Sequence, residues 1–264
     1  MQQINQKERT NGWVNGFIGM LIFSGSLPAT KAAVLGFDPL FLTAARATIA
    51  GLLSLAMLLL YKEKLPTFRQ WVSLTVVSLG VVVGFPLLTA IALQEITSAH
   101  SLVFLALLPL STAIFAVIRG GEKPRLIFWL FSIIGSLLVM GYAISQGGAS
   151  SISADLLMIA SVIVCGLGYA EGATLTKALG GWQVICWALI VSLPPMLILS
   201  FILMPEELTT ISVSAWVGLG YVSIFSMLIG FIFWYKGLSQ GGIAAVGQLQ
   251  LLQPFFGLGL AAVL

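Results

Sequence analysis

Long apolar runs constrain the fold of this chain more than any other feature. Nine runs of about twenty residues are separated by short stretches of polar residues, glycine or proline. A helix needs about 20 apolar residues to cross a bilayer, whereas a membrane-spanning β-strand needs only about ten residues of alternating polarity. Because the runs do not alternate, they predict helices. They lie at residues 13–35, 39–61, 70–92, 99–118, 126–144, 156–178, 182–203, 213–236 and 242–264.

The composition excludes a water-soluble domain. Hydrophobic residues make up 59% of the chain and charged residues only 8%, whereas soluble domains are about 25% charged. Lipid tolerates such a surface when helices satisfy their own backbone polar groups. We therefore predict an all-α integral membrane protein. The first apolar run is interpreted as a retained span, because it is longer than the core of a signal peptide and ends without a cleavage site.

The loop charges predict how the chain is oriented. If the N-terminus is cytoplasmic, the cytoplasmic side carries Lys7, Arg9, Lys62, Lys64, Arg69, Arg119, Lys123, Arg125, Lys177 and Lys236. The loops of the other side then carry acidic residues and no basic ones: Asp38, Glu95, Asp155, Glu206 and Glu207. Basic residues in short loops stay in the cytoplasm. The pattern predicts a multi-pass protein of the cell (inner) membrane with a cytoplasmic N-terminus.

The two halves of the chain repeat one another. At an offset of 145 residues the sequence repeats Trp71, Leu74, Ser78, Ala99, Leu107, Pro109 and Ala116, and a one-residue gap adds Lys31, Gly84 and Phe85. The repeat unit holds five spans, an odd number, so the second copy enters the membrane from the opposite side. Inverted repeats are typical of secondary transporters with alternating access. We predict two inverted five-helix repeats, residues 1–144 and 145–264, which form one transport domain around a central cavity.

Two segments resemble the signature of a known family. Residues 107–122 form a run with an early proline, small and apolar residues and a Gly-Glu turn, and residues 252–264 look like a second copy. This pattern resembles the EamA repeat of the drug/metabolite transporter superfamily, and the chain is most similar to its YddG-type (aromatic) amino-acid exporters. The resemblance implies ten helices, so we expect a tenth span beyond Leu264. It also implies export of small metabolites, amino acids included, without a cofactor.

Signatures of catalysis are missing from the sequence. It has one histidine, His100, two cysteines within apolar runs, Cys165 and Cys186, and no metalloprotease, serine-hydrolase or phosphate-binding motif. We predict a protein that is not an enzyme and needs no metal or nucleic acid, whose partners are a small-molecule substrate and the lipid bilayer. The alternatives are a transporter of other metabolites or drugs and a channel or non-transporting membrane scaffold.

Ionisable residues inside the apolar runs are the first candidates for a binding site. Charges at membrane depth are costly and usually face the interior of a bundle or a cavity. Glu171 is the deepest acid, predicted to bind the ammonium of an amino acid or, without a cation, to carry a proton. Its structural alternatives are an ion pair and a protonated residue that serves packing. Arg46 is predicted to bind the carboxylate, unless a helix N-terminus does so. Lys31 lies near the end of its run, where it could reach the membrane interface.

Aromatic and amide side chains of the later runs complete the predicted site. The residues expected to line the cavity are Tyr169, Trp187, Tyr221, Trp234, Gln248 and Gln253. Pro109 and Pro254 are predicted to kink their helices, either as hinges next to the site or as kinks that only serve packing. The pairs Gly80/Gly84 and Gly168/Gly172 are expected to allow close helix packing.

Overall fold

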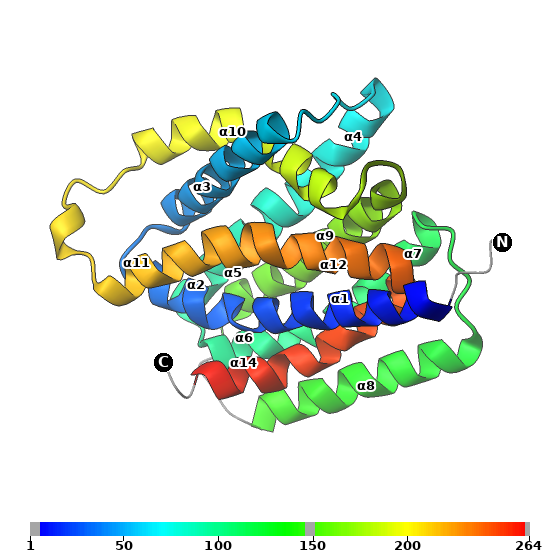
Figure 1. Cartoon of the computed structure of the whole chain (residues 1–264). Helices are drawn as coiled ribbons and strands as arrows, with labels where there is room; N and C mark the ends of the chain where they lie inside the picture. Colours follow the sequence, from blue (N-terminus) through cyan, green and yellow to red (C-terminus); the bar gives the residue numbers. More distant parts are fainter. Residues whose placement is uncertain (1–5, 146–150, 262–264) are drawn as a thin grey trace.

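The computed structural model describes residues 6–145 and 151–261, and this part of the chain is helical without strands (Figure 1). The first five spans are α1 (Gln6–Ser24) with α2 (Ser26–Val34); α3 (Pro39–Leu60); α4 (Phe68–Val77), the π-helical η1 (Ser78–Gly84) and α5 (Phe85–Glu95); α6 (Ser98–Leu105) with α7 (Leu108–Ile118); and α8 (Leu126–Ser145). The order matches the predicted spans one by one.

The second half repeats this order for four spans. They are α9 (Ile152–Leu179); α10 (Gly181–Ile202); α11 (Val213–Gly220), the π-helical η3 (Tyr221–Ile229) and α12 (Gly230–Gly241); and α13 (Ile243–Gly247), the 3₁₀-helical η4 (Gln248–Leu252) and α14 (Gln253–Ala261). A short 3₁₀ turn, η2 (Leu208–Thr210), lies between α10 and α11. The π-helical segments occupy equivalent places in the two halves.

Seven helical segments in the described part of the chain are long and apolar enough to cross a membrane. The other two predicted spans are α8 and the ninth span, which the η4 segment interrupts. The prediction of an all-α membrane protein is confirmed. The first helix begins at Gln6, seven residues before the predicted run, because a helix can continue through polar residues that hydropathy does not count.

The fourth and ninth spans are both broken next to their prolines. The fourth span has a break between α6, which ends at Leu105, and α7, which begins at Leu108. Pro109 and Pro254 are each the second residue of the helix that follows a break. Proline fits there because the first N–H groups of a helix have no partner within the helix. Each proline therefore begins a helix instead of bending one, and a hinge role stays a prediction.

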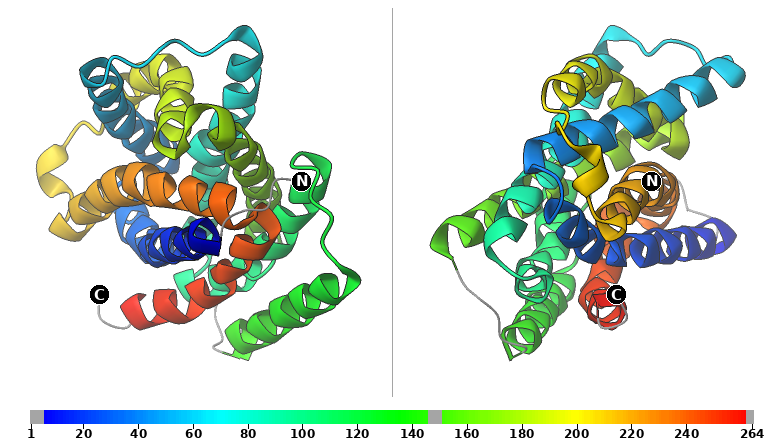
Figure 2. Two further views of the ribbon diagram at one scale, coloured as in Figure 1. Left: turned by 45° about the vertical axis from the view of Figure 1, so that its right-hand side comes forward. Right: turned by 90° about the vertical axis from the view of Figure 1, so that its left-hand side faces the viewer.

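The helices form two bundles, and a pair of helices along one side contacts both of them (Figure 2). In the first bundle, α9 packs against α4, η1, α5 and α7, and we count α6 with it; in the second bundle, α1 and α2 pack against α12 and α11, with α13 and α14 beside them. The first bundle thus combines two spans of the first repeat with one span of the second, and the second bundle combines two spans of the second repeat with one of the first. A two-fold relation between inverted repeats produces this exchange. Helices α3 and α10 pack on each other, and α8 lies on the outside against α6 and α7.

Glycines allow the closest crossing within the first bundle. Gly80 of η1 meets Gly168 of α9 so closely that a Cβ on Gly80 would lie 2.7 Å from the carbonyl oxygen of Val164 and 3.1 Å from the Cα of Gly168. Small residues let helix backbones approach in this way. The predicted packing role of these glycines is confirmed.

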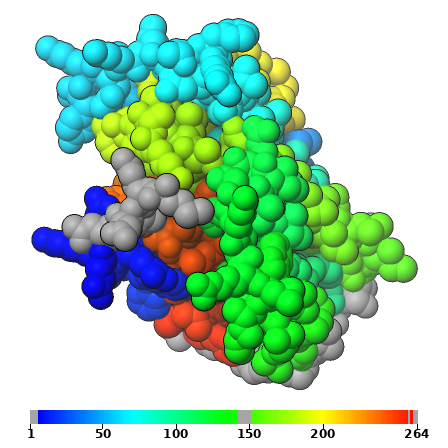
Figure 3. All heavy atoms as spheres, turned by 90° about the vertical axis from the view of Figure 1, so that its right-hand side faces the viewer, coloured from blue at the N-terminus to red at the C-terminus, as the bar shows by residue number. Residues whose placement is uncertain are grey.

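The two ends of the molecule differ in charge. The N-terminus lies at the end that carries the α3–α4 and α7–α8 connections, and Figure 3 shows this end. We call it the basic end; its charged residues include Lys62, Lys64, Arg69, Lys123 and Arg125. We call the other the acidic end; it carries Asp38, Glu95, Asp155, Glu206 and Glu207.

Candidate functional site

A small cavity lies where α3 meets both bundles. Its lining comes from nearly every central element: Phe23, Ser26, Leu27, Arg46, Val81, Phe85, Pro86, Leu108, Tyr169, Ser226, Phe231 and Gln253. The centre of a water molecule can occupy only about 20 Å³ of it, which is room for roughly one water. Sites for small organic molecules are usually several hundred Å³. The helices are therefore closed around the cavity in this conformation.

The cavity lies where equivalent residues of the two repeats meet. Phe23 and Tyr169 are 146 residues apart, as are Phe85 and Phe231, and Leu108 and Gln253 are 145 apart. These are the offsets at which the two halves of the sequence match. The apolar wall is therefore symmetric, whereas the exchange of Leu108 for Gln253 makes the two sides chemically different.

Aromatic rings form one wall of the cavity. Phe23 and Tyr169 stack with ring centroids 6.4 Å apart and planes 13° from parallel. Phe231 meets Phe23 edge to face at 5.0 Å and Tyr169 at 5.9 Å. Trp234 lies behind this wall, fully buried, with its ring 5.4 Å from that of Tyr169. Such a wall suits a flat apolar group.

The polar corner of the cavity is built around Arg46. Its Nη2 donates to the carbonyl oxygen of Val222 at 3.2 Å and to Ser226 Oγ at 3.4 Å, and Ser26 Oγ donates to Ser226 Oγ at 2.7 Å. The side chain is 5% exposed, and its Nε has no partner among the described residues. Among the described residues that line the cavity, none is acidic. A buried cation without a counter-ion costs several kcal/mol, so this corner favours an anionic ligand.

The amide side chains of the ninth span differ in their surroundings. Gln253 lines the cavity and donates from Nε2 to the carbonyl oxygen of Phe23 at 3.2 Å. Gln248 donates at 3.5 Å to the carbonyl oxygen of Ala244 in its own span and is not part of the lining. Gln250 is fully buried, and neither polar atom of its amide has a partner in the described part of the chain. One of the two predicted glutamines therefore reaches the cavity.

Glu171 is not part of the cavity lining. Its Oε2 accepts a 2.7 Å hydrogen bond from Arg119 Nε just after α7, and Ser73 of α4 contacts the same carboxylate. Successive residues of an α-helix are rotated by about 100°, so Glu171 lies about 200° around α9 from Tyr169. Because Tyr169 faces the cavity, Glu171 faces α4 and α7. One of the structural alternatives, an ion pair, is what its contacts show.

Two other predicted residues also lie outside the lining. Trp187 packs edge to face on Trp71, with ring centroids 5.5 Å apart. Tyr221 donates its hydroxyl to the carbonyl oxygen of Ile22 at 2.7 Å and stacks on Phe225. Both aromatic side chains join helices to one another. Of the eight predicted binding residues, Arg46, Tyr169 and Gln253 line the cavity.

Sequence reasoning missed most of the symmetric wall. Phe23, Phe85 and Phe231 line the cavity, as do Ser26 and Ser226. The match between Gly84-Phe85 and Gly230-Phe231 was a usable signal, because residues near a two-fold axis come in equivalent pairs. The serines have no comparable signal, since serine is common on the packed faces of membrane helices.

The fold and the cavity define a helical membrane transporter built from two inverted repeats. The sequence profile of the EamA-like transporter family matches residues 10–143 and again residues 152–264. The chain therefore belongs to the EamA-like transporter family. A crystal structure of 19% sequence identity superposes with a TM-score of 0.74 over 97% of this chain and 90% of the other, which shows the same fold.

Two relatives are described as uncharacterized transporters. The chain is 65% identical over 255 residues to the uncharacterized transporter YdeK of Bacillus subtilis, covering 97% of this chain and 89% of YdeK. It is 27% identical over 214 residues to the uncharacterized inner membrane transporter YedA of Escherichia coli, covering 79% of this chain and 68% of YedA. These relatives agree on membrane transport and name no substrate.

Proposed function

We propose that the chain is a secondary transporter that exports small carboxylates, amino acids and in particular aromatic ones, by alternating access. The observation that carries this proposal is Arg46, a buried guanidinium with an unpaired Nε beside an aromatic wall. A substrate carboxylate would supply the missing acceptors in a bidentate, charge-assisted pair. An aromatic side chain would pack against the wall formed by the rings of Phe23, Tyr169 and Phe231. The helices must open to admit it.

The ammonium of an amino acid needs a different partner from the predicted one. Glu171 is already paired with Arg119, so we assign it to the packing of α4, α7 and α9. Neutral oxygens on the lining, those of Gln253, Ser26 and Ser226, would bind the ammonium. A cavity with one cation and no acid also suits an aromatic acid without an amino group. That is the second candidate substrate.

The charge of the two ends supports an orientation of the protein in the membrane. The basic end would face the cytoplasm, because basic residues in short loops are retained there. Export then means that the cavity fills from the basic end and empties at the acidic end.

Counterflow in proteoliposomes tests the proposal. Labelled phenylalanine should accumulate against unlabelled phenylalanine inside, which a channel cannot produce. Arg46→Met should lower the initial rate about 10- to 100-fold, since a hydrogen bond to a charged group contributes about 1.5–3 kcal/mol. Arg46→Lys should retain part of the activity, because it keeps the charge and loses the fork geometry. Arg69→Met, an exposed arginine at the basic end, is the matched control.

Competition separates the two candidate substrates. Phenylalanine, 3-phenylpropanoate and phenethylamine share the ring and differ in which charges they carry. If phenylalanine and 3-phenylpropanoate compete and phenethylamine does not, Arg46 binds the substrate carboxylate. Competition by 3-phenylpropanoate alone favours the organic acid. Unchanged counterflow by Arg46→Met would refute the site.

A further inference from the structure

Two charged side chains cross directly from one bundle to the other, one at each end of the molecule. At the acidic end, Lys31 of α2 donates from Nζ to the carbonyl oxygens of Leu93, at 2.6 Å, and Ile96, at 3.1 Å. At the basic end, Glu122 in the α7–α8 connection accepts from the N–H groups of Ile243, at 2.6 Å, and Ala244, at 2.9 Å. Both side chains are partly buried.

The chemistry of these two contacts is complementary. Lys31 places an ammonium on carbonyl groups at the end of α5, where a helix leaves its last acceptors free and carries partial negative charge. Glu122 places a carboxylate on free N–H groups where the ninth span begins. Charge-assisted hydrogen bonds of this kind are about twice as strong as neutral ones. Each contact therefore holds the two bundles together at its own end.

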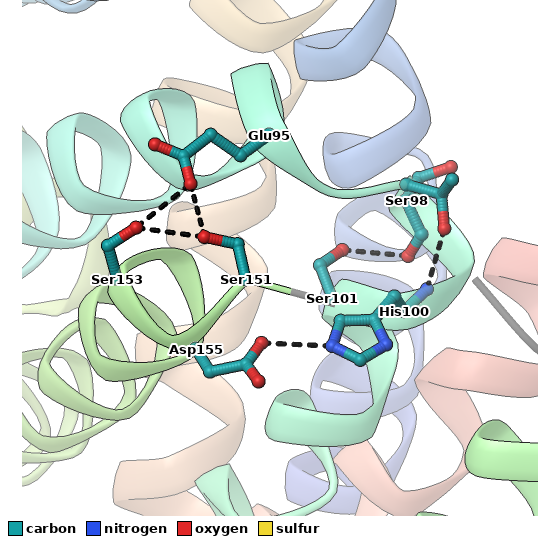
Figure 4. A network of polar contacts seen from close by, with 8 residues as sticks. Glu95, Ser98, His100, Ser101, Ser151, Ser153 and Asp155 are labelled. Carbon is teal, nitrogen blue, oxygen red and sulfur yellow. Dashed lines mark hydrogen bonds and ion pairs between the residues drawn. The ribbon is translucent and has the colours of Figure 1, made fainter. Parts of the chain in front are cut away.

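A further set of charged contacts lies within the first bundle. Figure 4 shows the network at the acidic end, where His100 of α6 meets Asp155 of α9 at 2.9 Å and Glu95 of α5 binds Ser151 and Ser153 at the start of α9. At the other end, Arg119 meets Glu171. These contacts bind α9 to α5, α6 and α7 at both of its ends. The first bundle can thus move as one body while the contacts between bundles change.

Lys31 and Glu122 join the elements that flank the cavity. Lys31 connects α2, which supplies Ser26 and Leu27 to the lining, with α5, which supplies Phe85 and Pro86. Glu122 follows α7, which supplies Leu108, and binds the start of the span that supplies Gln253. Separating α2 from α5 would open the cavity toward the acidic end. Separating α7 from α13 would open it toward the basic end.

We propose that Lys31 and Glu122 are the two gate latches of the transport cycle, each closing the cavity at its own end. The inference rests on the proposed alternating access and adds the residues that control it. Both latches are formed in this structure, in agreement with a cavity that holds about one water. Opening toward one end releases one latch while the other stays closed. The Gly-Gly-Glu turn of the sequence positions Glu122 for this latch, and Gly121 adopts φ +65° in that turn.

Side-specific labelling of a cavity cysteine tests this without any substrate. Ser226→Cys, in a background with Cys165→Ala and Cys186→Ala, reports access of a membrane-impermeant thiol reagent, applied to intact cells and to inside-out vesicles. Glu122→Gln should raise the labelling rate about tenfold from the side that the basic end faces, which corresponds to about 1.4 kcal/mol. Lys31→Gln should do the same from the other side. Lys123→Gln, one residue from Glu122 and outside the latch, is the matched control.

The outcomes separate the latches from the transport proposal. Glu122→Asp keeps the charge and should lie between wild type and Glu122→Gln, which provides a readout if the amide variant does not fold. Opposite shifts in the two variants support the latches even when no amino acid is transported. The latch proposal is overturned if the labelling rate changes equally from both sides while counterflow remains intact. It is also overturned if the rate does not change in variants that elute as monodisperse protein and retain counterflow.

Discussion

Replacing Arg119 by glutamine should destabilise the protein more than replacing its partner. The Glu171 side chain is 7% exposed and that of Arg119 46%, so Arg119→Gln leaves a buried carboxylate with the neutral Ser73 as its remaining contact. Removing one partner of a fully buried pair costs about 3–5 kcal/mol. Because water reaches Arg119, we expect about 2 kcal/mol. Glu171→Gln leaves a solvated guanidinium and a neutral amide, and should cost less than about 1 kcal/mol.

Thermal unfolding of the purified protein in detergent measures this difference. A loss of about 2 kcal/mol should lower Tm by about 4–8 °C at this chain length. The double variant should be more stable than Arg119→Gln alone, because the stranded charge is gone, and the cycle should give a coupling of about 1–2 kcal/mol. Strictly additive losses would refute the reasoning.

The same variants decide whether Glu171 acts in transport. If its task is to pack α9 against α4 and α7, Glu171→Gln should retain phenylalanine counterflow at about pH 6 and about pH 8, a range in which a carboxyl group tuned for proton transfer titrates. A selective loss of substrates that carry an ammonium would instead return Glu171 to the substrate path.

Three further predictions follow from the packing, the cavity and the loops. Gly80→Ala should lower Tm by several degrees, because its Cβ would lie 2.7 Å from a backbone oxygen, whereas Gly220→Ala, with nothing within 4 Å of its Cβ, should leave Tm equal or slightly higher. Gln253→Leu should make the cavity symmetric with Leu108 and lower the counterflow ratio of phenylalanine to 3-phenylpropanoate roughly 10- to 100-fold, the value of one hydrogen bond to a charged group; an unchanged ratio would remove Gln253 from ammonium binding. A cysteine at Ser153 should react with an impermeant reagent in intact cells, and one at Lys123 only after permeabilisation; the reverse order would place the basic end outside.

Hydropathy and loop chemistry were sufficient to predict the helices of this protein. Each apolar run became one span, and Pro109 and Pro254 marked both breaks, because lipid leaves few alternatives to a helix and proline interrupts one. Arg46, Tyr169 and Gln253 were found because polar or aromatic side chains deep in a span usually face inward.

The sequence did not show which side of each helix contacts which neighbouring helix. Glu171 is deep and acidic, yet it lies two residues from Tyr169 on the other side of α9, and only the neighbours α4 and α7 show that this side is also buried. Trp187 and Tyr221 are interior aromatic residues that pack on other helices. An apolar run of a membrane helix is hydrophobic on all faces, so it carries little information about which face meets which neighbour.

The π-helical segments bear on how the two halves could diverge. The sequence offset between the halves changes from 145 at Ser78 to 146 at Gly84, and η3 has nine residues where η1 has seven. An extra residue in an α-helix would turn everything beyond it by about 100° and remove its side chains from their faces. A π-helical turn absorbs a residue locally, so Phe231 still lies opposite Phe85 at the cavity. A gene of this kind can therefore gain or lose single codons at that place while its binding site stays in register.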